Sequence, residues 1–354
     1  MKWIGLSCLL LIPASAWAQF NYTTNNGAIT ITKYTGSAGA AIIPATINGL
    51  PVIGIGNNAF NSSTNLTSIA IGSNICSIGD RAFYFCTKLT NVPLPDSVTN
   101  IGREAFEYCL KLNGIAVPSS VKSIKTGTFF NCSSLTNIAL SSNITSIADN
   151  AFSSCASLTE ITIPNSVTFL GSYVFDSCYK LASVTLTNGF SAIGDFAFYS
   201  CANLTNFTIP ESVTNIGDSA FKNCSSLRDI TIPDSITNIG ASAFYGCSAL
   251  SKALIGNNIA SIGDNAFGNC TGMNEIKLGN QIKNIGSFAF YSCLSLTNIT
   301  IPNSVTNIGD YAFSQCYALQ GIYFAGNAPR VSSTAYYVAN KLTNYYLPGT
   351  TNWG

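Results

Sequence analysis

The segment 296–316 reads LTNITIPNSVTNIGDYAFSQC, and its pattern decides the fold because it recurs along most of the chain. Aligned on the Phe of the Ala-Phe pair, the recurrence gives twelve aromatic positions, each 23 residues from the next, with no insertion. These positions are Phe60, Phe83, Phe106, Phe129, Phe152, Phe175, Phe198, Phe221, Phe244, Phe267, Phe290 and Phe313. A fixed period of this length is typical of a solenoid, in which each unit buries its apolar side only against its neighbours.

Other columns keep the same period. A Cys follows the Phe by three residues in every unit except the first, where Ser63 takes its place. A Leu follows by six residues, with Met273 as the single exception, and Ile precedes by five residues, with Leu170 as the exception. We therefore expect these columns to form a continuous core.

Each unit divides into two halves. The first, as in Leu296–Ile301, alternates apolar and polar β-branched residues and ends at a Pro, which predicts a short strand with one buried face. In the second half, the position of Asp310 holds Asn, Asp, Ser or Thr in ten of twelve units, just before Ala and Phe. This pattern predicts a short helical turn with a capped amino end. A Gly usually precedes the cap, which predicts a tight backbone bend.

The pattern L-x-x-I-x-I-P-x-S-V-T-x-I-G-x-x-A-F-x-x-C, seen in 204–224 and 296–316, resembles the BspA-type leucine-rich repeat of bacterial surface proteins. The resemblance implies an α/β fold, namely a right-handed horseshoe of about twelve 23-residue repeats. It places a parallel sheet on the concave face and short helical turns on the convex face. It also implies extracellular display and roles in adhesion or protein binding, and it carries over no catalytic residues.

The ends of the chain differ from the repeats. Residues 1–18 combine Lys2, a short apolar run and the sequence Ala16-Trp17-Ala18, which predicts a signal peptide cleaved after Ala18. We expect an amino-terminal cap at 19–36 and a repeat domain at 37–327. Residues 328–354 are rich in Tyr and predict a degenerate capping segment.

Charge is scarce and balanced. The 354 residues include 16 Lys plus Arg, 15 Asp plus Glu and no His. This balance argues against a nucleic-acid partner, which needs a clustered basic field. No apolar run approaches the roughly 20 residues that are needed to span a bilayer, and this argues against stable membrane insertion. The absence of His removes the commonest general base, and no nucleophile–base pair or phosphate loop stands out from the repeats, so we expect no enzyme and no cofactor.

The cysteine column admits three interpretations. A Cys-rich exported chain is often held by disulfides, and neighbouring repeats could bring two Cys close enough for one. A metal site is the least favoured, since the chain has no Cys-x-x-Cys pair. We favour buried free thiols that act as small apolar side chains, because the column holds eleven Cys, one per repeat.

Two polar columns have simple structural explanations. The Asp column could bind calcium, yet other residues interrupt it and each Asp stands at a cap position, so capping is preferred. A Thr column could bind ice or polysaccharide, although β-branched residues also suit any exposed strand. Its members are Thr162, Thr185, Thr208, Thr231 and Thr300, interrupted by Leu254 and Lys277.

A third column is aromatic and follows the repeat Phe. Its members Tyr84, Tyr199, Tyr245 and Tyr291 could form a convex contact strip or pack over the turns.

The strand position two residues after the Leu should face the concave surface, and its charges concentrate between Glu160 and Lys277. The candidate ligand-binding residues are Glu160, Asp229, Lys252 and Glu275 at this position, with Arg228 and Lys277 beside them. From these observations we expect an exported, non-enzymatic protein that binds an extracellular protein or glycan through its concave face. The alternative is a passive envelope protein, monomeric or weakly associated end to end through its edge strands.

Overall fold

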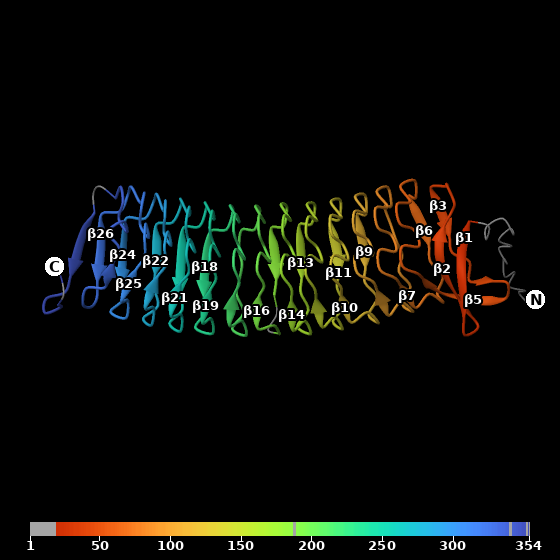
Figure 1. The fold of residues 1–354 in the computed structure, drawn as a ribbon, viewed down its shortest axis with the longest axis horizontal. Coiled ribbons are helices and arrows are strands. Elements are labelled where there is room, and N and C mark those ends of the chain that lie inside the picture. The colour runs from red at the N-terminus through yellow and green to blue at the C-terminus, as the bar shows by residue number, and fades with distance from the viewer. Residues whose placement is uncertain (1–18, 187–188, 340–341, 352, 354) are drawn as a thin grey trace, which may run out of the picture.

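The computed structural model describes residues 19–186, 189–339, 342–351 and 353. The chain winds into a β-solenoid in which successive turns lie side by side along one long axis, with the two termini at opposite ends (Figure 1). The described residues contain no helix, so the expected α/β class is wrong and the fold is all-β. The predicted signal peptide, 1–18, lies outside the described residues.

Most turns contribute one strand to a face that we call the long-strand sheet, and the repeats of Asn91 and Asn206 contribute only isolated bridges. Its strands are β3 (Ala40–Ile42), β6 (Ser68–Ala70), β9 (Gly114–Ala116), β11 (Asn137–Ala139), β13 (Glu160–Thr162), β15 (Ser183–Thr185), β18 (Asp229–Ile232), β20 (Lys252–Ile255), β22 (Glu275–Lys277), β24 (Asn298–Ile301), β26 (Gly321–Phe324) and β28 (Thr343–Tyr346). Paired strands are parallel, and between repeats the register offset is 23 residues, as in Asp229 opposite Lys252. The 23-residue period of the sequence therefore equals the offset between directly opposite residues of paired strands.

A second row of two-residue strands follows the corner of each repeat, where six repeats carry a Pro. It consists of β7 (Ser77–Ile78), β8 (Asn100–Ile101), β10 (Ser123–Ile124), β12 (Ser146–Ile147), β14 (Phe169–Leu170), β16 (Ala192–Ile193), β17 (Asn215–Ile216), β19 (Asn238–Ile239), β21 (Ser261–Ile262), β23 (Asn284–Ile285), β25 (Asn307–Ile308) and β27 (Arg330–Val331). The Ile or Leu of these strands is buried, so the repeated Ile joins the core as expected.

The predicted helical turn is wrong, because consecutive β-turns fill that part of each repeat. Two residues per repeat, four apart, adopt left-handed backbone conformations, for example Arg81 (φ 55°) and Phe85 (φ 59°). The amides of Arg81, Phe83 and Phe85 donate to carbonyls of the next repeat at 2.8 Å each. The intervening amides donate three residues back within their own repeat, as Tyr84 does to Arg81. An α-helix would instead direct each amide to the fourth preceding carbonyl.

The Asp column does cap amides, but the amides belong to the neighbouring repeat. The Oδ1 atom of Asp80 accepts from the backbone N–H of Arg103 at 2.8 Å, and Asp149 accepts from Ser172 at 2.9 Å. Asp195, Asp218 and Asp264 accept in the same way from the residue 23 positions onward. These carboxylates therefore connect turns rather than begin helices.

The glycine before the cap is explained by close approach and not by an unusual bend. A Cβ added to Gly102 would lie 2.3 Å from the backbone carbon of Gly79 in the preceding turn. The left-handed conformation falls two residues later, on Glu104 (φ 55°). The predicted tight bend at this Gly is therefore replaced by contact between adjacent backbones.

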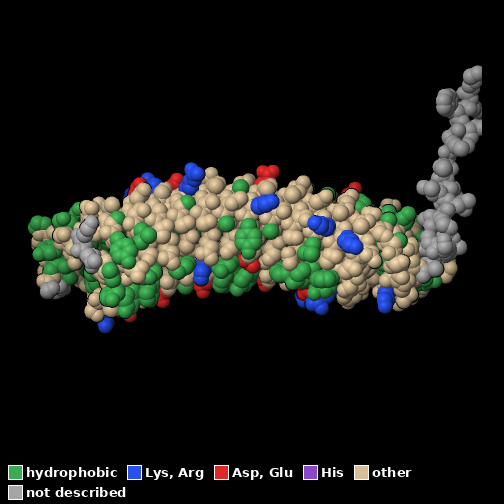
Figure 2. All heavy atoms as spheres, turned by 90° about the horizontal axis from the view of Figure 1, so that it is seen from above, with side chains coloured by type: hydrophobic (Ala, Val, Ile, Leu, Met, Phe, Trp, Pro, Cys, Tyr) green, Lys and Arg blue, Asp and Glu red, His purple; other side chains and the backbone are tan. Residues whose placement is uncertain are grey.

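The body is a nearly straight rod and not the expected horseshoe (Figures 1 and 2). Curvature of a repeat array follows when one side is wider per repeat than the other. A helix occupies about 10 Å, whereas a strand occupies about 4.8 Å. Here the turn side carries its own ladder of inter-repeat hydrogen bonds, so both sides advance by a similar distance.

A column of stacked rings runs through the core. Successive repeat Phe rings lie 5.0–5.7 Å apart between centroids and within 22° of parallel. Tyr34 stacks on the first of them, and Tyr336 stacks on the last. The two tyrosines extend the column by one turn at each end, so the solenoid has about fourteen turns in place of the expected twelve.

The cysteine column is buried and reduced, as expected for free thiols. Each of its eleven thiols donates to the carbonyl of the Phe in the preceding repeat, at 3.1–3.3 Å. Burial raises the pKa of Cys86, Cys155 and Cys247 to about 12. The thiol therefore fills a small apolar space and supplies a weak donor between turns.

The amino-terminal segment forms a hairpin over the first repeat. Strand β1 (Phe20–Asn25) pairs antiparallel with β2 (Ala28–Tyr34), which pairs with β5 (Leu50–Ile55). Strand β4 (Thr46–Ile47) meets β5 in a second hairpin, whose turn residues Asn48 and Gly49 both have positive φ. An Asn-Gly pair favours such a turn.

Candidate binding face

The long-strand sheet carries all six of the predicted ligand-binding residues. Glu160 lies on β13, Arg228 immediately precedes β18, and Asp229 begins β18. Lys252 lies on β20, and Glu275 and Lys277 lie on β22. The structure thus brings five of them together on three adjacent strands.

Asp229, Lys252 and Glu275 form one row across these strands. Asp229 lies opposite Lys252, and Lys252 lies opposite Glu275. The Lys252 ammonium is 2.8 Å from a Glu275 carboxylate oxygen, and both side chains are about half exposed. Asp229 accepts a hydrogen bond from the Ser251 hydroxyl at 2.9 Å. Within the described residues, this row therefore contains one surface ion pair, Lys252–Glu275, beside the carboxylate of Asp229, which has no ionic partner, and a polar partner could compete for these groups.

Glu160 stands apart from that row. Ser183 and Asn206 occupy the two intervening positions of the same column, so Glu160 is three strands from Asp229. At one strand spacing each, the separation is about 14 Å. The 23-residue period predicts this separation as well, because Glu160 and Asp229 lie three repeats apart in the sequence.

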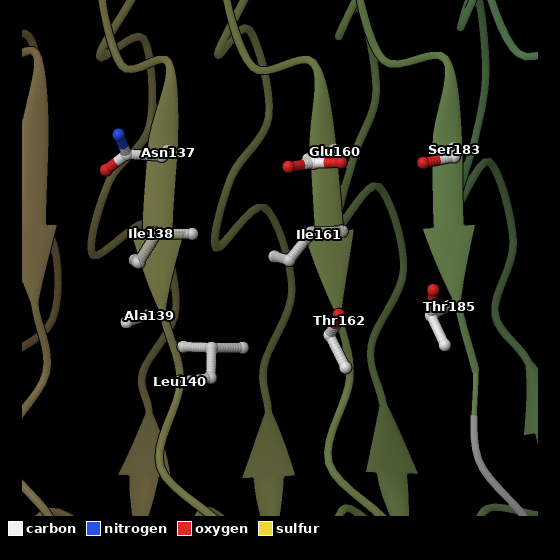
Figure 3. Close-up of a pocket in the computed structure, with 9 residues that line it drawn as sticks. All are labelled: Asn137, Ile138, Ala139, Leu140, Glu160, Ile161, Thr162, Ser183 and Thr185. Carbon is white, nitrogen blue, oxygen red and sulfur yellow. The ribbon is translucent and has the colours of Figure 1, made fainter.

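Two hollows open in the sheet where its pairing is interrupted. Hollow A, about 330 Å³, lies across β11, β13 and β15, and its lining includes Glu160, Ala139 and Leu140 (Figure 3). Strands β11 and β13 belong to separate hydrogen-bonded sheets, so hollow A lies over a gap in the ladder. In Figure 3 Glu160 lies between Asn137 and Ser183 of the flanking strands.

Hollow B, about 360 Å³, lies between β15 and β20 at the next interruption. Its repeat has only isolated bridges through Asn206 in place of a strand. It is lined by Asn206, Phe207, Thr208, Ile209, Glu211, Asp229, Thr231 and Pro233. The sequence signal for these hollows is weak, because both repeats keep the full set of core residues.

The Thr column also lies on this face. All five of its threonines are exposed. Leu254 and Lys277 interrupt the column, and Tyr323 extends it toward the carboxyl end, where its ring stacks on Tyr345 at 4.7 Å. A regular, uninterrupted Thr array is therefore absent from this described sheet.

The tyrosines of the turn side pack against neighbouring rings. Tyr84 contacts Tyr108 at 5.9 Å and Tyr291 contacts Phe288 at 5.7 Å between ring centroids. The Tyr245 hydroxyl accepts from Asn269, and the Lys222 ammonium lies 5.1 Å from the Tyr245 ring centre. These rings are half-buried, whereas Tyr179 and Tyr317 are exposed. Tyr84, Tyr245 and Tyr291 thus pack over the turns, and the convex contact strip stays a prediction.

A charged cluster on the turn side was not foreseen. Arg81 pairs with Glu104, and the Arg81 guanidinium lies 5.7 Å from the Tyr84 ring centre. Burial, together with the nearby charge of Glu104, raises the pKa of Glu107 to about 7. The carboxyl is half-buried, so it titrates near neutral pH.

We expect Glu107→Gln to stabilise the protein at pH 8 by on the order of 1 kcal/mol, allowing for solvent screening. A group whose pKa is raised on folding binds its proton more tightly in the folded state. Stability therefore falls as pH rises from about 4.5 to about 7. Urea unfolding of both proteins at pH 4 and pH 8 measures this. An equal difference at the two pH values would contradict the assignment.

The described residues contain no group of three or more His, Cys, Asp or Glu side chains placed to hold a metal ion. In the same ranges no helix has the length and apolar character needed to cross a membrane. Charged side chains are scattered sparsely over the face in Figure 2, most of which is uncharged. The polar features that stand out on the long-strand sheet are therefore the ion-pair row and the hollows.

Comparisons with solved structures and protein families agree with the repeat pattern. A leucine-rich cell surface protein of Faecalibacterium prausnitzii is 31% identical over 87% of this chain and 94% of that chain, with a TM-score of 0.56. A leucine-rich repeat protein of Bacteroides ovatus is 27% identical over 92% and 88%, with a TM-score of 0.55. One of Eubacterium ventriosum is 26% identical over 82% and 91%, with a TM-score of 0.51.

No curated protein matches the chain. The model of the BspA-type leucine-rich repeat region matches residues 53–182, 145–272 and 238–353, which overlap and together span most of the solenoid. Proteins of this kind are typically found at bacterial cell surfaces, and their repeat is a scaffold. The period, the parallel solenoid and this match lead to one conclusion: the chain belongs to the BspA-type leucine-rich repeat family.

Proposed function

We propose that this protein is an exported, non-enzymatic adhesin-like scaffold that binds an extracellular protein or glycan through its long-strand sheet. The observation that carries the proposal is the row of Asp229, Lys252 and Glu275, whose charged side chains lie on adjacent strands of a sheet with few other charges. Twelve strands at about 4.8 Å give a face of about 58 Å. That length exceeds what a standard interface of about 800 Å² per partner needs.

The residue pattern before Ala18 and the surface location of similar proteins support export and display. A scaffold role is supported by the repeat itself, since the residues that recur are core, turn and inter-turn hydrogen-bonding residues. Exposed sheet positions, which the core does not constrain, are where repeat proteins usually bind.

An array of glycans and extracellular matrix proteins, probed with the chain beginning at Gln19, tests the proposal. We expect a ligand whose binding falls at least tenfold when Asp229, Lys252 and Glu275 are all replaced by Ala. As a control, Lys88→Ala with Lys111→Ala removes exposed charge from outside the sheet and should leave binding within twofold. A ligand bound equally by the triple variant would place the site elsewhere.

Self-association is a second candidate, favoured by one observation at the carboxyl end. Strand β28 pairs on one side with β26, and its residues Tyr345 and Tyr346 are exposed. An exposed strand with apolar side chains can pair with another chain. Light scattering over a concentration series distinguishes the candidates, because end-to-end association increases the mass whereas a monomeric binder keeps it constant.

A further inference from the structure

The long-strand sheet carries two further hollows that adjoin hollow A. Hollow C, about 610 Å³, is lined by residues 91–94, 113–116, Asn137 and Ala139. Hollow D, about 320 Å³, shares Leu94, Ala116 and Ala139 with hollow C, and it shares Ala139 and Leu140 with hollow A. The three hollows therefore form one shallow groove along the rod, and hollow B continues its direction.

The charged side chains that line these four hollows all have the same sign. They are Asp96 in hollow D, Glu160 in hollow A, and Glu211 and Asp229 in hollow B. No Lys or Arg lines any of the four hollows. The two ion pairs found in the described residues, Arg81–Glu104 and Lys252–Glu275, use none of these carboxylates. The hollows thus present negative charge beside apolar surface.

This combination suits a basic side chain. A Lys side chain has an apolar stem of four methylene groups and a charged end, and it favours sites that offer apolar surface beside an anion. Hollow A places Leu140, Ala139 and Ile161 beside Glu160. Hollow B places Phe207, Ile209 and Pro233 among its lining residues together with the two carboxylates. Each hollow offers surface for the stem and an acceptor for the ammonium group.

The distance between the two hollows specifies the spacing of the basic residues. Glu160 and Asp229 occupy the same column, three strands apart, or about 14 Å along the rod. An extended peptide advances about 3.4 Å per residue, so four residues cover this distance. Side chains of an extended chain alternate between two faces, and residues i and i+4 point the same way.

We propose that the partner bound by this face is a protein that presents an extended segment with basic residues four positions apart. The segment runs along the rod, across the strands, with one basic side chain in hollow A and the next in hollow B. This inference rests on the proposed function and specifies the chemical class of its partner. Glycans, membranes and a second copy of the chain are alternative occupants.

Fluorescence anisotropy with labelled twelve-residue peptides of Ser and Thr tests the inference on the chain beginning at Gln19. The peptide with Lys at i and i+4 should bind, and the peptide with Lys at i and i+3 should bind about fivefold more weakly, since its lysines point to opposite faces. A peptide with Glu in place of Lys should not bind. Raising the salt from 50 to 500 mM should weaken binding by screening the charges.

Protein variants identify the hollows as the site. Glu160→Gln and Asp229→Asn should each weaken the i, i+4 peptide about threefold, and together about tenfold, in line with exposed ion pairs. With all variants assayed at pH 8, above the Glu107 pKa of about 7, Glu107→Gln removes a negative charge on the turn side and should leave the affinity within twofold. Circular dichroism would verify that each variant is folded.

Three results would overturn the inference: no binding of the i, i+4 peptide at millimolar concentration, equal binding of all lysine spacings, or no effect of the Glu160 and Asp229 changes. Tighter binding of an acidic glycan or of anionic vesicles would likewise reject a basic protein segment. If the peptides fail while an array ligand remains sensitive to the triple variant, the proposed function stands and only this partner class is excluded.

Discussion

Replacing Phe221 by Ala should lower the free energy of unfolding by about 3–5 kcal/mol, the usual cost of emptying a buried Phe site. The Phe221 ring is fully buried and stacks between Phe198 and Phe244 at 5.3 and 5.2 Å. It also meets Phe207 edge to face at 4.7 Å. The cavity would thus remove contacts to two neighbouring turns at once.

The cavity left by Phe221→Ala should also separate the rod into two weakly coupled halves. In a repeat array each turn is stabilised mainly by its neighbours, so a cavity in the middle weakens the coupling between the two halves. Denaturant unfolding followed by circular dichroism should show a lower midpoint and a broader transition. Phe169→Ala, which removes a ring that is 55% exposed, is the matched control and should change stability by less than about 0.5 kcal/mol. Similar losses for the two variants would reject the ring column as the main source of coupling.

The folded chain beginning at Gln19 should react with a thiol reagent at one cysteine and the unfolded, non-reduced chain at twelve. Cys76 is exposed, whereas the eleven column thiols are fully buried. Only a thiolate reacts rapidly, and burial holds the pKa of Cys132 and Cys201 in the column well above the usual range. Titration with a chromogenic disulfide, before and after adding guanidinium, counts both populations.

Cys76→Ser supplies the control for that count. The folded variant should show no fast thiol and the unfolded variant eleven, since only the exposed residue is changed. A loss of thiols in pairs from the unfolded wild-type chain would mean that neighbouring repeats form disulfides. In that case the paired cysteines would not donate hydrogen bonds to the Phe carbonyls.

Much of the fold could be predicted from the columns. The 23-residue period set the strand register, and the Phe, Leu and Ile columns are the core. The Cys column was assigned to buried thiols because one Cys per repeat and the substitution by Ser63 fit a packing role. The turn at Asn48 and Gly49 follows from local conformational preference alone, because an Asn-Gly pair favours positive φ at both residues.

The turn side could not be predicted in the same way. Asp before Ala-Phe has the composition of a helix start, yet the amides of Arg81 and Phe85 donate to the next repeat. Left-handed residues cost free energy that a single repeat would not recover, and hydrogen bonds between turns offset this cost. The wrong prediction of helical turns therefore also led to the wrong prediction of a horseshoe, because the curvature of a repeat array depends on the width of its turn side.

The features of the candidate site also divide into those that the sequence predicts and those that depend on the tertiary structure. The sequence by itself determined the solenoid, its register and which residues are exposed on the long-strand sheet, because a repeated core pattern leaves a repeated set of outward positions. Only the tertiary structure decided that the rod is straight, that Asp caps link neighbouring turns, and that Glu160 lies in a hollow of the sheet. These features depend on contacts between repeats, where small differences in strand pairing open or close hollows in the surface. The repeat pattern of the sequence does not specify those contacts.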